Sequence, residues 1–429
     1  MSPLLTDFAG VSIYALGFAR GGVLDKFFIA SGKTANTTYS TSVHINSANL
    51  ITWTMFDQGS THLWATITAD GTFGTSYGYV GANWSVPMLN AKSDAAGNTF
   101  VSAAVSGVSQ YQLQPAKTTG SSVTWTRKLG NVASYTSYGI LDTDSSGNVY
   151  VTGLTTTMRT SSEVVLGKWN SSGTIQWQKY YTSPTWTYNR CDDISVSSSG
   201  NVYLAAAYNS TSTNASGVMK LDSSGAVSWQ RVATALNPTA AGTKIASDSS
   251  DAVYAYIGEK LTKFDSSGTY QWANFISTSF IQYDVATDTA GNVYTVHGNG
   301  ITIWLVKYNS SGTIQWQRSI TSSSGALYLG SQYGQTRSII SATDTAVTIA
   351  ASDNTNAVLF KLPTDGSLTG AYIVNATTYT YAASSLSPSS STNSYSSHTV
   401  NMANLTATEA ANSLSISTQT PTYAKKVIP

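Results

Sequence analysis

A short phrase recurs along this chain, and a repeat at regular spacing restricts the fold more than any other feature of the sequence. Clear copies read SDAAGNTFVSA, TDSSGNVYVTG, SSSGNVYLAA and TDTAGNVYTV, and a degenerate copy reads SDSSDAVYAY. Their aromatic positions follow one another at intervals of 50, 53, 51 and 40 residues, at Phe100, Tyr150, Tyr203, Tyr254 and Tyr294.

A second phrase follows each copy of the first. It reads KWNSSGTIQWQK, KLDSSGAVSWQR, KFDSSGTYQWAN and KYNSSGTIQWQR, and a looser version precedes them. Its tryptophans are spaced 52, 52, 43 and 44 residues apart, at Trp125, Trp177, Trp229, Trp272 and Trp316. A repeat of this length that contains strand-like segments is typical of propeller blades, whose period is about 40 to 50 residues.

The local chemistry of the second phrase predicts a hairpin followed by a strand. Asn or Asp followed by Ser-Ser-Gly forms a short loop, because the glycine can adopt the positive φ that closes it. After the loop, apolar Ile175 and Trp177 flank polar Gln176, which is the alternation of a strand with two different faces. No helical periodicity separates the two phrases, so a parallel βαβ arrangement is disfavoured.

Weaker copies of the hairpin at residues 64–77 and 359–370 bring the count to seven. We therefore predict an all-β fold, a β-propeller of seven four-stranded blades, with six or eight blades as the alternatives. The two degenerate copies are the first and the last, and they would meet where the ring closes.

The phrase DSSGNVYVTG at residues 144–153 resembles the SBBP-type β-propeller repeat of bacterial surface proteins and bacteriophage structural proteins. The resemblance covers roughly residues 92–362 and implies a propeller fold. It brings no catalytic residues with it. Propellers serve as enzymes, lectins and scaffolds alike, so the resemblance supports the fold more than the function.

Charged residues make up 10% of the chain, well below the roughly 25% of an average soluble domain. A net charge of +1 argues against a nucleic-acid partner, because phosphate binding requires clustered Lys and Arg. Cys191 is the sole cysteine, so an intramolecular disulfide is impossible. We expect no membrane span, because no window approaches 18 apolar residues, and no signal peptide in residues 1–10.

Three segments are predicted: an N-terminal arm or attachment segment at 1–40, the propeller at 41–375, and a Ser/Thr-rich C-terminal extension at 376–429. The opening residues resemble the starts of phage tail-associated proteins. As an alternative to an arm, they supply strands to the first blade. The extension either returns to complete that blade or reaches another subunit.

The repeated tryptophans are interpreted as packing between blades, because a residue kept at one strand position in every blade is most simply part of the core. Candidate recognition residues are instead the aromatic residues of two loops outside the pattern. One loop holds Tyr181, Trp186 and Tyr188, and another holds Tyr328 and Tyr333. Aromatic loops of low charge bind glycan or protein surfaces, or pack on adjacent blades or sister subunits.

Other polar residues give weaker indications. His297 follows a predicted blade strand and is a candidate for facing the central channel, although its isolation favours a structural histidine. Asp142, Asp144 and Asn148 alternate like calcium ligands, but the pattern lacks the downstream Glu, and a turn requires the same residues. Asp192 and Asp193 are adjacent in a strand, which points them to opposite faces and disfavours a glycosidase pair. We predict no catalytic residues, metal site or cofactor, and hence that the chain is not an enzyme.

These features favour a bacteriophage virion structural protein, tail-associated as a fibre, tip or baseplate part, whose propeller is a rigid scaffold or a receptor-binding head. Expected partners are other virion proteins, with several copies in a symmetric assembly, and a host surface glycan. The expected location is the virion, assembled in the host cytoplasm. The alternatives are a bacterial cell-surface or secreted carbohydrate-binding adhesin, and a polysaccharide-degrading enzyme.

Overall fold

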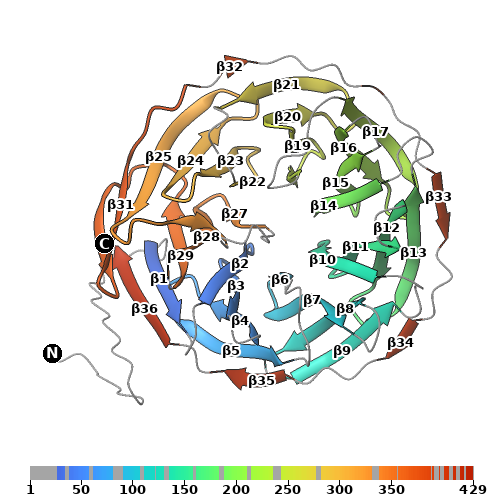
Figure 1. Ribbon diagram of the computed structural model, residues 1–429, viewed down its shortest axis with the longest axis horizontal. Coiled ribbons are helices and arrows are strands. Elements are labelled where there is room, and N and C mark those ends of the chain that lie inside the picture. The colour runs from blue at the N-terminus through green and yellow to red at the C-terminus, as the bar shows by residue number, and fades with distance from the viewer. Residues whose placement is uncertain are drawn as a thin grey trace.

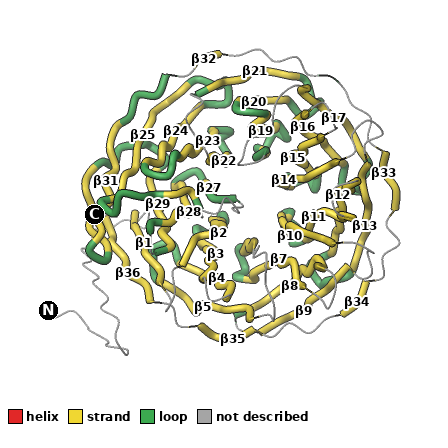
Figure 2. The backbone as a smooth tube through the Cα atoms, in the orientation of Figure 1, coloured by secondary structure: helices red, strands yellow, loops and turns green. Residues whose placement is uncertain are grey.

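The computed structural model describes residues 27–33, 38–57, 61–80, 90–106, 111–120, 122–129, 135–157, 161–182, 188–209, 214–234, 243–276, 282–330, 338–354, 356–387, 389–390, 396, 401–404, 409–411, 416–419 and 422–428. In this part of the chain every regular element is a strand (Figure 2). None of the described residues forms a helix that is long and apolar enough to cross a membrane.

Seven antiparallel sheets stand around a central axis as the blades of a β-propeller (Figure 1). The predicted fold class and blade number are therefore confirmed. In each blade the first strand lines the axis and the fourth lies outside. The first three blades comprise β2 (Thr38–Ile45), β3 (Ile51–Asp57), β4 (Thr61–Ile67) and β5 (Phe73–Val80); β6 (Asn90–Ser93), β7 (Asn98–Ser106), β8 (Tyr111–Thr119) and β9 (Ser122–Leu129); and β10 (Tyr135–Thr143), β11 (Val149–Thr157), β12 (Ser161–Trp169) and β13 (Ile175–Thr182).

The next three blades repeat this plan. They comprise β14 (Tyr188–Val196), β15 (Val202–Asn209), β16 (Asn214–Leu221) and β17 (Val227–Thr234); β18 (Ile245–Ser247), β19 (Val253–Ile257), β20 (Lys260–Phe264) and β21 (Tyr270–Phe275); and β22 (Gln282–Thr287), β23 (Val293–Gly298), β24 (Thr302–Tyr308) and β25 (Ile314–Ser322).

The seventh blade takes its outer strand from the other end of the chain. Its inner strand is β27 (Ile340–Ala342), followed by β28 (Ala346–Ser352) and β29 (Ala357–Pro363). The short strand β26 (Tyr328–Leu329) also pairs with β28. The fourth strand is β1 (Phe27–Lys33), which pairs antiparallel with β29 from Phe28↔Lys361 to Gly32↔Ala357. The ring is thus closed by hydrogen bonds between the two ends of the propeller.

This closure changes two boundaries drawn from the sequence. Residues 27–33, which the sequence predicts as part of an arm or as a strand of the first blade, form the outer strand of the seventh blade. The hairpin predicted at residues 359–370 does not continue into a fourth strand of its own blade, because the chain after it joins β25 of the sixth blade. Periodicity could not show this exchange, since β1 carries neither repeat phrase.

The predicted turns form as expected. Between β10 and β11 the Asp144 carboxylate accepts the backbone N–H groups of Ser146 and Asn148, at 3.0 and 2.9 Å. Gly147 has a φ of 72°, which glycine adopts without strain. The first phrase of the repeat is therefore the turn from the first to the second strand of a blade, and the second phrase is the turn from the third to the fourth.

A belt surrounds the ring. The chain leaves the seventh blade, forms β30 (Gly370–Val374) and β31 (Thr377–Ala383) on the outside of the sixth blade, and then runs backwards around the molecule (Figure 1). We call β31 to β36 the belt. Its remaining strands are β32 (Ser389–Ser390) on β21, β33 (Asn401–Asn404) on β13, β34 (Glu409–Ala411) on β9, β35 (Ile416–Gln419) on β5 and β36 (Thr422–Ile428) on β1, and Ser396 bridges to Val232 of β17.

Candidate functional site in the central channel

Each repeated tryptophan joins its blade to the next one. The indole N–H donates to the main-chain carbonyl oxygen at the tip of the following blade's hairpin, at 3.0 to 3.1 Å in all five cases: Trp125 to Ser171, Trp177 to Ser223, Trp229 to Ser266, Trp272 to Ser310 and Trp316 to Thr364. The interpretation of these tryptophans as packing between blades is confirmed.

The lysine that opens the second phrase reaches the same carbonyl oxygen. Lys263, for example, donates to Ser310 O at 2.8 Å, and its ammonium lies over the Tyr254 ring, 5.1 Å from the ring centroid. The Trp272 ring also packs against Tyr254, with 5.9 Å between the ring centroids. We call this unit, a Trp and a Lys of one blade on one carbonyl of the next, the clasp.

The glycine of the hairpin makes room for the clasp. A Cβ on Gly268 would lie 2.6 Å from the Trp229 ring, and one on Gly312 would lie 2.9 Å from the Trp272 ring. The glycines of the second phrase therefore serve both the turn and the packing of the preceding blade's indole. The most conspicuous repeated residues are consequently committed to the ring.

Tyr181, predicted as a recognition residue, belongs to one of these interfaces. It is 1% exposed, and its hydroxyl donates to Gly225 O of the next blade at 3.0 Å. Arg127 and Arg231 make the corresponding contact at two other interfaces, to Gly173 O and Gly268 O. Tyr181 is therefore a packing residue in place of a ligand-facing one.

Among the described residues, the structure does not place the other aromatic candidates next to one another. Tyr328 lies half-buried on β26 and packs against Gly300, where a Cβ would be 3.1 Å from its ring. Tyr188 begins β14 and pairs through its backbone with Asn209, and its side chain is outside the description. Trp186 and Tyr333 lie outside the described residues.

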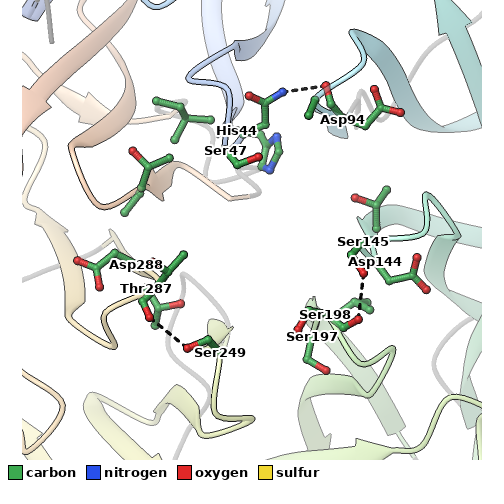
Figure 3. A pocket seen from close by; sticks show the side chains of 18 of the residues that line it. His44, Ser47, Asp94, Asp144, Ser145, Ser197, Ser198, Ser249, Thr287 and Asp288 are labelled. Atoms are coloured by element: carbon green, nitrogen blue, oxygen red, sulfur yellow. Dashed lines mark hydrogen bonds between the residues drawn. The ribbon is translucent and has the colours of Figure 1, made fainter. Parts of the chain in front are cut away.

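The central channel opens at one face of the ring into a mouth of about 870 Å³. The turns between the first and second strands of all seven blades line this mouth, and Figure 3 shows His44, Asp94, Asp144, Ser197, Ser249 and Asp288 around the open centre. Apart from the calcium alternative at Asp142, Asp144 and Asn148, the sequence predicts these turns as separate hairpins and not as one site. Their common signal, an Asp or Ser at the same place in each copy of the first phrase, would have placed them on one ring.

The carboxylates at the mouth are held by their own turns. Asp144 Oδ2 accepts the Asn148 side-chain amide at 2.7 Å and the Tyr150 hydroxyl at 3.0 Å. Asp288 is bonded in the same way by Asn292 and Tyr294. Serine and threonine hydroxyls also line the mouth, and such groups bind other polar and polyhydroxylated molecules.

Deeper in the channel, a cavity of about 280 Å³ is lined by His44, Lys92, Asp142, Asp193 and Asp284. Asp193 accepts the backbone N–H of Ile245 in the next blade at 3.2 Å, and Asp284 accepts that of Ile339 at 2.6 Å. Burial raises the pKa of both carboxyl groups, that of Asp193 to about 6.

Asp142 contacts both of its neighbours. Its carboxylate pairs with Lys92 of the second blade at 2.6 Å and accepts the backbone N–H of Val196 of the fourth blade at 2.8 Å. With Asp144 held by its turn, the two carboxylates of the calcium alternative are bonded to protein donors. Among the described residues, no three His, Cys, Asp or Glu side chains gather as a metal site would require.

Asp192 and Asp193 do not point apart as predicted. A register shift between Cys191 and Asp193 interrupts the alternation of β14, so both carboxylates reach the fifth blade, Asp192 at the N–H of Thr243 and Asp193 at that of Ile245. Both side chains are buried. The pair connects inner strands, a role that the alternation rule alone does not reveal.

The two histidines nearest this region differ in position. His44 lines the channel, burial together with nearby Lys92 lowers its pKa well below 6.5, and its Nδ1 has no hydrogen-bond partner among the described residues. His297 lies on the second strand of its blade, away from the axis, and its Nε2 is 3.2 Å from the Tyr256 hydroxyl. Burial lowers the His297 pKa to about 3, so it is a neutral structural residue.

The fold and the channel define a seven-bladed β-propeller protein with a polar axial channel. No family model matches the chain, and no curated protein matches it. Among solved structures it is similar to a puromycin hydrolase mutant complexed with PGG, with a TM-score of 0.50 and 11% identity over 76% of this chain and 52% of that one. It is also similar to a PL25 ulvan lyase, a polysaccharide lyase, with a TM-score of 0.49 and 9% identity over 78% and 94% of the two chains. This chain therefore spans about half of the puromycin hydrolase.

The prediction that the chain is not an enzyme is contradicted by this comparison. The same propeller fold occurs in a protein that is a hydrolase, so an all-β repeat architecture does not exclude catalysis. At 11% identity the likeness shows the fold and defines no enzyme family for this chain.

Proposed function

We propose that this chain is a structural protein of a bacteriophage virion, associated with the tail, and that its propeller is a rigid scaffold or receptor-binding head built from SBBP-type repeats. The observation that carries the proposal is the clasp, which joins five successive pairs of blades through the same carbonyl contact. Such contacts hold neighbouring blades together without a disulfide, which a single cysteine could not supply within the chain.

The physical setting supports this role. A virion part has to keep its fold outside the cell for long periods, so its operational stability is a rate of unfolding. Opening this ring would break a clasp together with the antiparallel β1–β29 pairing that closes the seventh blade. Every copy in a symmetric assembly would present the same two faces, the channel mouth and the opposite loops, to its neighbours.

Labelling of purified particles tests the proposal. Antibodies raised against the recombinant protein should label the tails of virions from the source culture in immunogold electron microscopy, and mass spectrometry should detect the chain in those particles. Labelling confined to bacterial cell surfaces would instead support the adhesin alternative. Absence of the chain from purified particles would overturn the virion proposal.

Receptor binding is tested separately on a glycan array. The Trp186→Ala/Tyr188→Ala variant should lose binding to the host glycan, and Tyr372→Phe, which lies outside both candidate loops and removes only a hydroxyl bonded to Thr369 O, serves as the control. Melting curves establish that both variants are folded. Equal binding by the wild type and the double variant would exclude these two aromatic residues as the recognition site.

A further inference from the structure

The belt contacts all seven blades, and it does so in the reverse of their order in the chain. Starting from the sixth blade, it passes the fifth, fourth, third, second and first and ends on the seventh. Each contact is antiparallel, and each is made on the outermost strand of the blade. The belt segment is therefore an additional strand outside the four strands of each blade.

Among the described residues of the belt, the hydrogen-bonded pairing covers more positions at the two ends than between them. β31 is in register with β25 at five positions, and β36 is in register with β1 at seven. Between these anchors the register covers two positions on β21, four on β13, three on β9 and four on β5. On β17 the contact is the pair Ser396 and Val232, with two main-chain hydrogen bonds of 3.0 Å.

A side-chain contact secures the point where the belt passes from the sixth blade to the fifth. Gln317 Nε2 donates to Leu386 O at 2.9 Å, and Gln317 Oε1 accepts the Leu386 N–H at 2.5 Å. The Leu386 side chain packs against the hydrophobic cluster that holds Tyr254 and Tyr308. The belt is thus fixed by ladder hydrogen bonds and by a residue of the blade beneath it.

We propose that the outer edges of the blades are strand-accepting surfaces, and that the belt is the chain's own strand, which fills them and excludes a second copy of the protein. An uncovered outer strand presents a row of unpaired N–H and C=O groups, which is a template for pairing with another chain. Two copies meet little electrostatic resistance, since the net charge of each is +1. The belt therefore both locks the ring and keeps it separate from its copies.

Paired prolines in the full chain test this proposal. Adjacent strand residues direct their N–H groups to opposite edges, so Ala403→Pro/Asn404→Pro removes one N–H that faces β13. Ala403→Ser/Asn404→Ser keeps both N–H groups and is the matched control. Hydrogen exchange of the β13 amides should be about tenfold faster in the proline variant and unchanged in the serine variant.

Light scattering over a range of concentrations supplies the second readout. The proline variant should form dimers and larger species, whereas the wild type and the serine variant keep one mass. Unchanged β13 exchange would show that the belt does not cover this edge. Faster exchange with an unchanged mass would show that the edge does not accept a strand, and either result overturns the proposal.

A milder variant keeps the test decisive if the prolines prevent folding. Gln317→Ala removes the contact with Leu386 and leaves the ladder intact, and it should accelerate exchange in β21 and promote association. Gln315→Ala, on the same strand and exposed, removes only a contact with Thr313 and should behave as the wild type. Identical exchange and mass in these two variants would also overturn the proposal.

Discussion

The five clasped interfaces and the interface that closes the ring use different chemistry. At the clasped interfaces a half-buried or buried Trp and a Lys meet one carbonyl oxygen, as Trp229 and Lys220 meet Ser266 O at 3.1 Å each. At the closure, Lys361 repeats half of this arrangement by donating to Ala69 O at 2.9 Å, and no tryptophan hydrogen bond accompanies it among the described contacts. The closure depends instead on a large apolar cluster that joins the sixth, seventh and first blades.

Main-chain and hydroxyl contacts complete the closure. Val43 N donates to Ser338 O at 2.9 Å, and Ser40 N donates to the Ser352 hydroxyl at 2.9 Å. Trp53 is fully buried beside them and donates to the Ser40 hydroxyl at 3.0 Å. The comparison teaches that a repeated sequence supplies a repeated polar contact, whereas the unique interface is stabilised mainly by apolar burial.

The largest expected difference is between two tryptophans. Trp53→Ala at the closure should lower the free energy of unfolding by about 3–5 kcal/mol, because it leaves a cavity in the apolar cluster. Trp229→Ala at a clasp should cost about 1–3 kcal/mol, since that indole is half-buried and makes one hydrogen bond. Guanidinium unfolding followed by circular dichroism measures both. Equal costs would show that clasp and closure are energetically equivalent.

Two glycines isolate the packing part of the clasp. Gly268 and Gly97 have nearly the same φ, 79° and 82°, but a Cβ meets the Trp229 ring at Gly268 and nothing within 4 Å at Gly97. Gly97→Ala should cost about 1 kcal/mol for the backbone alone, and Gly268→Ala about 2–4 kcal/mol. The midpoints of denaturant unfolding give the comparison. If the two variants differ by less than the error of the measurement, the Trp229 indole moves aside at no cost in stability.

The smallest expected effect is the pH dependence that one carboxyl group in the clasped part of the ring contributes to stability. Burial raises the pKa of the Asp193 carboxyl from 3.8 to about 6, with Asp284 raising it further and Lys244 opposing the shift. The folded state therefore binds the proton more tightly than the unfolded state. The stability due to this group falls as the pH rises from 3.8 to 6, the part lost between pH 4.5 and pH 6 is about 2 kcal/mol, and the stability stays at its lower value above pH 6.

The difference in unfolding free energy between the wild type and Asp193→Asn, measured between about pH 4.5 and pH 7.5, isolates this contribution and should fall as the pH rises. Ser341→Ala, which removes the hydroxyl that accepts the Ile45 N–H at the closure, should lower stability without changing its pH dependence. A difference that does not change with pH would assign the pH dependence to other buried groups, among them Asp284 and His44.

The candidate site was only partly predictable. Turn chemistry located Asp144 and its counterparts in the repeat, but their convergence on one channel mouth depends on the closure of the ring. The prediction of Tyr181 as a recognition residue was wrong, because its place among other aromatic residues in the sequence suggests a binding loop. In the structure it lies at the interface position that Arg127 and Arg231 occupy in other blades. The roles of Asp192 and Asp193 depend on a bulge, which a two-residue alternation does not predict.

The sequence by itself determined the strands, the hairpins and the number of blades, because these depend on contacts within a few residues and are repeated many times. It also determined the role of the tryptophans, since strict periodicity implied packing. Only the tertiary structure decided that residues 27–33 close the seventh blade and that the belt runs backwards around the ring. Those pairings join segments hundreds of residues apart, such as Ala30 with Lys425, through backbone groups that every residue possesses, so no local pattern specifies them.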